Sequence, residues 1–413
     1  MSFVATPKVN FISAVFFDVS VILPQALGFF RECMAVSFLS HELSDLCIGK
    51  PALKSLPISA TVGEALFALR QSGEAYVSVW TSDSSKPETK SCAGKLCMVD
   101  ILCYLCAKDN ISSPAAALKN PVSVLLSKEA AALVRCVESH SRVIDALDLI
   151  LEGAHILLVP IRSRKKLQPH HSGIFCWLTP EDFARFFFNS ISVFSPIAAC
   201  SVTQLGLVRS TDILAVHHHD PALSALPLIH RALAEQTSVA VVTEDRKLIG
   251  EISPSTLTGC DESVAAALAV LSAGDFMAYI DWCTSPPDAA VRALKSLLKK
   301  KGMHEMVELM DVVSKPVLSS STSSSSDEEG EIRKRPRRLR RLGSYSSRMG
   351  RRSEEAIVCH PGSSLVAVMV QALAHRVGYV WVVEEDYGLV GIVVLRDILK
   401  VFRDQFAEQF LIS

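Results

Sequence analysis

The segment GYVWVVEEDYGLVGIVVLRDIL, from Gly378 to Leu399, contains the pattern that predicts the architecture of this chain. Two runs of aliphatic and aromatic residues flank an acidic, glycine-containing turn, a pattern that predicts a β-hairpin. A polar step at Arg396 and Asp397 leads into an amphipathic segment, which indicates the start of a helix. An Asp at this junction can serve either the helix or a bound molecule.

Nearly the same phrase occurs three more times upstream, as CAGKLCMVDIL at Cys92–Leu102, HSGIFCWLTPEDF at His171–Phe183 and RKLIGEISPSTL at Arg246–Leu257. Each copy follows a segment in which apolar residues recur at helical spacing, and then a short β-type run. A unit of about 60 residues with this order would leave one sheet face bare, so we expect the copies to pack in pairs. The preceding segments are residues 60–80, 141–161, 221–242 and 363–383.

A βαββα unit that ends in glycine, two aliphatic residues, Thr or Ser, two residues and Asp resembles the cystathionine β-synthase (CBS) domain. Pairs of CBS domains form Bateman modules. The resemblance covers most of the chain after Ser44. Four copies are similar to plant four-CBS proteins and, distantly, to the gamma regulatory subunit of AMP-activated protein kinase. The resemblance implies an α/β (α+β) fold with four βαββα CBS repeats in two Bateman modules.

The repeats divide the chain into three predicted regions. Residues 1–43 form an N-terminal extension that we expect to be disordered. Phe11–Phe30 within it is apolar enough to suggest a membrane span, but Asp18 at its centre would cost about 2.5–3.5 kcal/mol. The sequence from Met34 onward resembles the beginning of a protein, so we interpret residues 1–33 either as a poorly ordered extension or as a gene-model artefact. The first module is predicted at 44–195 (repeats about 44–110 and 117–190), the second at 200–413 (repeats about 205–310 and 354–410), and a disordered linker at 316–353.

The net charge of −1, with 21% charged residues, argues against attraction to nucleic acid or acidic membranes. Basic charge is local, at Arg333–Arg341, a run that suits nuclear import or a nucleic-acid contact. Twelve cysteines without regular spacing suggest the reduced thiols of an intracellular protein. We therefore predict a cytoplasmic protein, with nuclear entry through Arg333–Arg341 as an alternative.

The CBS resemblance also implies a ligand. Adenosine ligands of CBS domains lie between paired repeats, where the Thr or Ser hydroxyl and the Asp carboxylate hold the ribose. An ionised carboxylate suits this role because it accepts two hydroxyl donors through charge-assisted hydrogen bonds. One repeat has both groups, two lack the hydroxyl and one lacks the acid. The residues carried over are Thr179 and Asp182 in the second repeat, Asp397 in the fourth, Asp100 in the first and Ser253 in the third.

Helix capping explains the same residues without a ligand. Thr179, Pro180 and Asp182 suit the N-cap, first and third positions of a helix, and such a cap is worth about 1 kcal/mol. Both interpretations stay open for these residues. For the phosphate groups, His375-Arg376 resembles a His-Arg pair of kinase gamma subunits.

Other motifs carry less weight. No glycine-rich phosphate cradle or nucleophile elbow is present, so we predict no enzyme and no catalytic residue. Cys103 and Cys106 form a C-x-x-C pair without a second ligand pair, and His217–His219 has no partner at metal-site spacing, so we predict no metal. The linker has candidate phosphorylation sites at Ser324, Ser325 and Ser326, each with an acid three residues later.

The leading hypothesis is a non-catalytic regulatory protein. Its CBS pairs would sense AMP, ADP, ATP or S-adenosylmethionine and modulate a partner protein, such as a protein kinase. A homodimer formed through the CBS modules is also consistent with the sequence. The alternative hypothesis is an interaction scaffold without ligand, or a regulatory subunit similar to kinase gamma subunits.

Overall fold

The computed structural model describes residues 40–83, 86–126, 131–161, 174–282, 286–313 and 356–411. Phe11–Phe30, Ser324–Ser326 and Arg333–Arg341 lie outside these ranges, so the predictions made for them stay predictions. Within the described ranges, no helix combines the length and the apolar character that crossing a membrane requires.

Four three-stranded sheets confirm the repeated unit. In each sheet the first strand runs parallel to the second, and the second pairs antiparallel with the third. The first repeat contains β1 (Ser55–Pro57), α3 (Val62–Ser72), β2 (Val77–Asp83), β3 (Lys86–Leu96) and α4 (Met98–Leu105). The second contains β4 (Val134–Cys136), α7 (Val143–Leu151), β5 (Ile156–Ile161), β6 (Ile174–Leu178) and α8 (Pro180–Asn189).

The third and fourth repeats follow the same order. The third contains β7 (Ala215–His217), η3 (Ala222–Ala225), α10 (Leu226–Glu235), β8 (Val239–Val242), β9 (Leu248–Ile252) and α11 (Pro254–Leu257). The fourth contains β10 (Val358–Cys359), α16 (Leu365–His375), β11 (Tyr379–Val383), β12 (Leu389–Val394) and α17 (Leu395–Leu411). The connecting elements are α2 (Leu43–Leu46), α5 (Pro114–Ala117), η1 (Val122–Leu125), η2 (Ile191–Phe194), α9 (Ser195–Ala198), α12 (Ser263–Val270), α13 (Ala273–Ile280), α14 (Asp288–Lys300) and α15 (His304–Val313).

Local sequence accounts for the ends of individual helices. Helix α3 begins with a capping box, because the Glu64 N–H donates to Thr61 Oγ1 at 3.1 Å and the Thr61 N–H donates to Glu64 Oε2 at 2.7 Å. It ends at Gly73, whose φ of 65° is the left-handed conformation that glycine adopts without strain. The residues that recur at helical spacing on α3 face the core: Val62, Ala65, Leu66 and Leu69.

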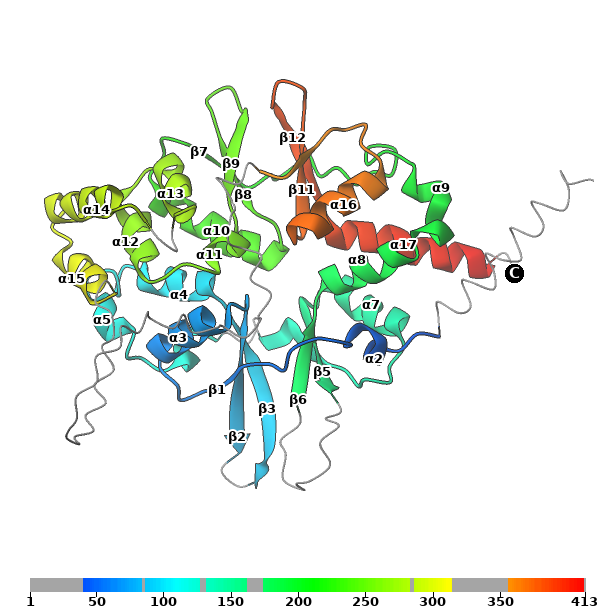
Figure 1. The fold of residues 1–413 in the computed structure, drawn as a ribbon, viewed down its shortest axis with the longest axis horizontal. Coiled ribbons are helices and arrows are strands. Elements are labelled where there is room, and N and C mark those ends of the chain that lie inside the picture. Colours follow the sequence, from blue (N-terminus) through cyan, green and yellow to red (C-terminus); the bar gives the residue numbers. More distant parts are fainter. Residues whose placement is uncertain are drawn as a thin grey trace, which may run out of the picture.

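The repeats pair through sheets within each half of the molecule and through helices between the halves. Figure 1 shows the first two repeats in the lower half and the last two in the upper half. Between the halves, α4 packs against α10, α11 and α12, and α8 and α7 pack against α17. In the lower half, the Trp80 and Phe175 rings lie 5.1 Å apart, and the Leu53 N–H donates to the Phe175 carbonyl. In the upper half, strands β8 and β9 share a buried cluster with β11 and β12.

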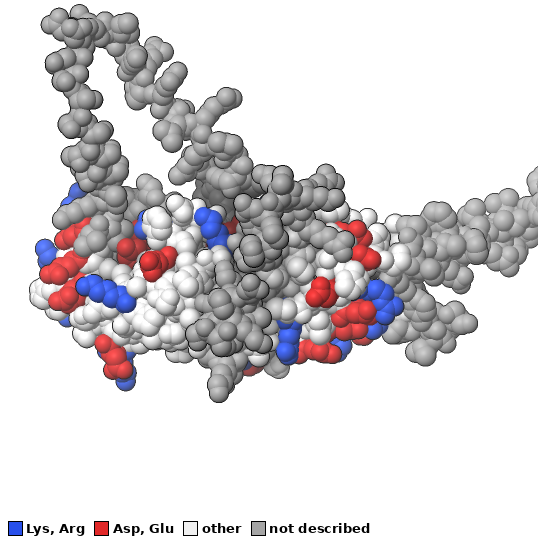
Figure 2. Space-filling view, turned by 90° about the horizontal axis from the view of Figure 1, so that it is seen from below, with Lys and Arg blue, Asp and Glu red and all other residues white. Residues whose placement is uncertain are grey.

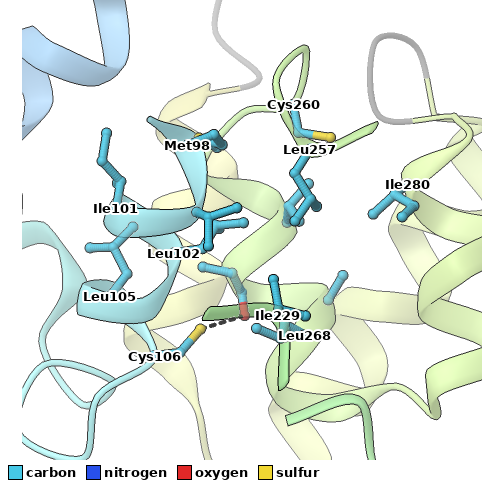
Figure 3. Packing of buried hydrophobic residues seen from close by; sticks show 14 of the residues in the cluster. Met98, Ile101, Leu102, Leu105, Cys106, Ile229, Leu257, Cys260, Leu268 and Ile280 are labelled. Atoms are coloured by element: carbon cyan, nitrogen blue, oxygen red, sulfur yellow. Dashed lines mark hydrogen bonds between the residues drawn. The ribbon is translucent and has the colours of Figure 1, made fainter. Parts of the chain in front are cut away.

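The interface between the first and third repeats is a continuous apolar core. Figure 3 shows Met98 and Leu102 of α4, together with Cys106, facing residues of the third repeat and of α12, including Leu257 and Leu268. The helices α12 to α15, inserted after α11, contribute buried side chains to this core, and α15 packs on α5. This helical insertion covers the edge of the interface.

Each half begins with a segment that crosses to its second repeat. Helix α2 packs on α8, and the Leu43 N–H donates to the Ser141 carbonyl at 2.9 Å. In the upper half, the segment before β7 pairs with the fourth repeat, where Arg209 and Ile392 exchange backbone hydrogen bonds of 2.9 and 3.0 Å. A Cβ on Gly391 would lie 2.5 Å from the Arg209 carbonyl oxygen, so the glycine of the repeated phrase permits this close approach.

Charges of one sign do not gather in a single patch on the described part of the face drawn in Figure 2. Acidic and basic side chains alternate over the described part of that face. This agrees with the near-zero net charge.

Candidate functional site

The second helix of each repeat begins at the polar position that the sequence singled out. The Cys97 N–H donates to Asp100 Oδ2 and the Thr179 N–H donates to Asp182 Oδ2, both at 2.8 Å. In the third repeat, the N–H of Thr256 donates to Ser253 Oγ at 3.1 Å. Helix capping therefore engages the candidate residues of three repeats, as the capping interpretation expects.

Asp397 of the fourth repeat has a different partner. Arg209 donates from Nε and Nη2 to the two carboxylate oxygens of Asp397 at 2.6 and 2.7 Å. Hydrogen bonding to Asp397 raises the pKa of Arg209 above its ordinary value. This bidentate pair occupies one acceptor position on each carboxylate oxygen, so a ribose at Asp397 would share the carboxylate with Arg209.

Asp182 is also held by a cation. Lys50 Nζ donates to Asp182 Oδ2 at 2.7 Å, and both side chains are largely buried. Lys50 and Arg209 come from the segments that cross to the second repeat of each half. In each half, therefore, a cationic side chain lies beside the candidate aspartate of that half's second repeat: Lys50 beside Asp182, and Arg209 beside Asp397.

Of the two remaining candidates, Asp100 is half-buried and Ser253 is fully buried. Burial raises the pKa of Asp100 above its ordinary value, although the hydrogen bond from Cys97 opposes this shift. Ser253 has no exposed surface. Neither side chain lines a described cavity.

All four repeats meet around a central cavity of about 370 Å³. Its walls come from equivalent places in the repeats: the turn before the second strand and the start of the second helix. Thr179 is the one residue among the five predicted site residues that lines it, and Asp397 lines an open groove of about 470 Å³ instead. Arg376 of the predicted His-Arg pair lines the cavity, whereas His375 does not.

Four residues of the cavity wall carry a buried polar atom that no described side chain or backbone group satisfies. The atoms are His155 Nδ1, Trp177 Nε1, Thr237 Oγ1 and Arg396 Nε. An unsatisfied buried polar atom costs about 1–3 kcal/mol, so such atoms are rare, and four of them in residues that line one cavity are consistent with an occupant. Trp177, Thr237 and Arg396 can each donate, which suits an acceptor-rich molecule.

The charges around the cavity are mixed, with a basic excess. Lys50, Arg376 and Arg396 line it, as do Glu74 and Glu181. Arg376 adopts a left-handed backbone with φ of 55°, at the position where α3 of the first repeat ends in glycine. Unfavourable backbone at a cavity wall is consistent with a functional position, because side chains other than glycine adopt it at some energetic cost.

Sequence reasoning missed His155, Trp177, Thr237 and Arg396. Two signals were present. His155 and Thr237 lie just before the second strand of their repeats, and Arg396 directly precedes the singled-out Asp397. Aligning the four copies at these positions would have grouped them.

Burial lowers the pKa of His155 from 6.5 to about 3, and the charges of Lys95 and Arg396 act in the same direction. The unfolded chain binds a proton as the pH falls below about 6.5, whereas the folded protein does not until about pH 3. We therefore expect the wild type to lose up to about 1.4 kcal/mol of stability per pH unit over this window, relative to His155→Gln. Urea unfolding between pH 7.5 and pH 4.5 measures the difference.

The exposed His140 provides the matched control. His140→Gln should leave the pH dependence of the wild type unchanged. Parallel curves for wild type and His155→Gln would show that His155 titrates normally in the folded protein.

The amino-acid sequence of this chain is similar to those of known proteins. A family model described as the CBS domain matches residues 352–404. The chain is 44% identical over 394 residues to the CBS domain-containing protein CBSX5 of Arabidopsis thaliana, a match that covers 90% of this chain and 98% of that protein. It is 22% identical to the SNF1-related protein kinase regulatory subunit gamma-like PV42b of the same plant, over 88% of this chain and 95% of that protein.

A solved structure shares the architecture. Protein MJ1225 of Methanocaldococcus jannaschii, described as a candidate archaeal homologue of g-AMPK, superimposes with a TM-score of 0.53 at 13% identity. The superposition covers 88% of this chain and 100% of that one. At this identity, the match concerns the fold alone.

Proposed function

Because this chain belongs to the CBS domain-containing proteins, we propose that it is a non-catalytic regulatory protein whose central cavity binds an adenosine-containing ligand and thereby modulates a partner protein. The observation that carries the proposal is the cluster of four unsatisfied polar atoms at the cavity where all repeats meet. A ligand with phosphate or carboxylate oxygens would satisfy the donors among them and balance the basic excess.

The cavity wall suits the parts of a nucleotide. Trp177 and Tyr76 supply aromatic surface for a base, and Thr179 supplies a hydroxyl. Arg376 and Arg396 supply charge for phosphate groups. Because the wall is drawn from four repeats, an occupant would favour one arrangement of the two halves over others, which is the basis for regulation.

Similarity to the kinase regulatory subunit gamma-like protein supports a protein kinase as the kind of partner. A second candidate function is an interaction scaffold without ligand. It is favoured by the ion pairs of Lys50 with Asp182 and of Arg209 with Asp397, because these pairs already engage the acids that would hold a ribose.

Calorimetric titration of the full chain with AMP, ADP, ATP and S-adenosylmethionine tests the proposal. We expect measurable binding of at least one ligand and an affinity that is weaker by about a hundredfold to ten-thousandfold for Arg376→Gln with Arg396→Gln. This estimate follows from about 1.5–3 kcal/mol for each hydrogen bond to a charged group. Thr179→Ala with Asp182→Ala examines the predicted ribose contacts in the same way.

Arg292→Gln is the matched control, since Arg292 is exposed on α14 and lies outside the cavity wall. It should bind like the wild type. Absence of heat for all four ligands would reject sensing of these molecules and leave the scaffold. Equal affinity in the wild type and the double arginine variant would place any ligand elsewhere.

A further inference from the structure

Two cysteines far apart in sequence have their sulfur atoms in contact. Cys47 Sγ and Cys176 Sγ lie 3.3 Å apart, although 129 residues separate them along the chain. Cys47 lies in the turn that ends α2, and Cys176 lies on β6 of the second repeat. Both are buried, and Cys47 retains 9% exposure whereas Cys176 has none.

The surroundings of Cys47 favour its thiolate. The hydrogen bond from Cys176 lowers the pKa of the Cys47 thiol below its ordinary value. The charge of Lys50 acts in the same direction, whereas burial and the Asp182 carboxylate oppose the shift. Lys50 belongs to the same turn, because its N–H donates to the Cys47 carbonyl at 3.2 Å. A thiolate beside a neutral thiol is the reactive arrangement for disulfide formation, because the thiolate is the nucleophile.

Other described cysteines lie in the opposite environment. Burial raises the pKa of Cys103 and of Cys106 to about 12 in each case, so these thiols stay protonated. Burial also raises the pKa of Cys359 to about 11. Cysteine reactivity follows thiolate content and access, so a mild oxidant should distinguish Cys47 from these side chains.

We propose that Cys47 and Cys176 form an oxidisable dithiol that a hydroperoxide converts into an intramolecular disulfide. The Cys47 thiolate attacks the peroxide, an S–O bond forms, the O–O bond breaks, and hydroxide leaves as the sulfenic acid appears. The Cys176 sulfur then attacks the Cys47 sulfur, the S–S bond forms and the S–O bond breaks. The departing hydroxide takes the Cys176 proton as water. Two electrons pass from the thiols to the peroxide.

The disulfide would join α2 to β6 and hold Lys50 beside Asp182 at the cavity wall. It would also restrict the unfolded chain, because it closes a loop that spans most of the first two repeats. The proposal does not depend on the nucleotide hypothesis, and its test requires no ligand.

The experiment treats the reduced full chain with a small excess of hydrogen peroxide, alkylates the remaining thiols and digests the protein without reduction. Mass spectrometry should find one dominant linked pair of peptides, which contain Cys47 and Cys176. The Cys47 peptide from trypsin also contains Cys33, so the Cys33→Ser variant is needed. That variant should keep the link, and Cys47→Ser should abolish it.

Two further readouts sharpen the result. Oxidation should raise the melting temperature of the wild type by several degrees, reversibly with dithiothreitol, and should not raise that of Cys47→Ser. In Cys176→Ser, Cys47 should react with dimedone as a sulfenic acid, whereas Cys106→Ser should behave like the wild type. The proposal fails if Cys47 and Cys176 are recovered as alkylated thiols while other cysteines are oxidised, or if Cys176 links to another cysteine.

Discussion

Phe402→Ala is expected to lower the free energy of unfolding by about 3–5 kcal/mol, the range for truncating a buried phenylalanine. Phe402 has no exposed surface and stacks on Phe187 of the second repeat, with ring centroids 5.1 Å apart and an interplanar angle of 9°. The Phe194 ring meets it edge-on at 4.7 Å. The alanine would leave a cavity at the junction of the second and fourth repeats, where both halves of the molecule contribute side chains.

Urea unfolding followed by tryptophan fluorescence and circular dichroism measures this loss. Phe67→Ala is the matched control because Phe67 is 65% exposed on α3, and its truncation should change stability by less than about 0.5 kcal/mol. If Phe402→Ala and Phe67→Ala unfolded at the same urea concentration, the aromatic cluster would not hold the halves together.

Glu251→Ala should lower stability by about 2–6 kcal/mol, since it leaves two buried donors without their acceptor at about 1–3 kcal/mol each. The Tyr379 hydroxyl donates to Glu251 Oε1 at 2.7 Å, and Trp381 Nε1 donates to Oε2 at 2.5 Å. Both donors belong to the fourth repeat, whereas Glu251 lies on β9 of the third. Burial and the Glu251 carboxylate raise the pKa of Tyr379 well above its ordinary value, which keeps this donor protonated.

Two further variants provide an intermediate loss of stability and a control for this prediction. Glu251→Gln keeps one acceptor oxygen but turns an NH₂ group toward the second donor, so about half the loss is expected. Glu244→Ala, at an exposed position, should have almost no effect. Equal stability of Glu251→Ala and Glu244→Ala would show that water replaces the carboxylate at the seam between the third and fourth repeats.

The candidate site was only partly visible in the sequence. The motif located the helix starts correctly, because capping acts between residues three apart, as between Thr179 and Asp182. It could not reveal that Arg209 would reach Asp397 from 188 residues away, or that Lys50 would reach Asp182 from 132 residues away. Whether these acids also contact a ligand stays a prediction, and the central cavity gives that question a defined place.

The four repeats and the order of strands and helices within them were predictable from the amino-acid sequence. These features depend on periodicity and on contacts between near neighbours, which a linear pattern records. The packing of the first repeat on the third and of the second on the fourth is apparent only in the folded protein. The same holds for the cavity that His155, Trp177, Thr237 and Arg396 line. The physical reason is that burial is shared between apolar faces of similar character, and their sequence does not specify which one meets which.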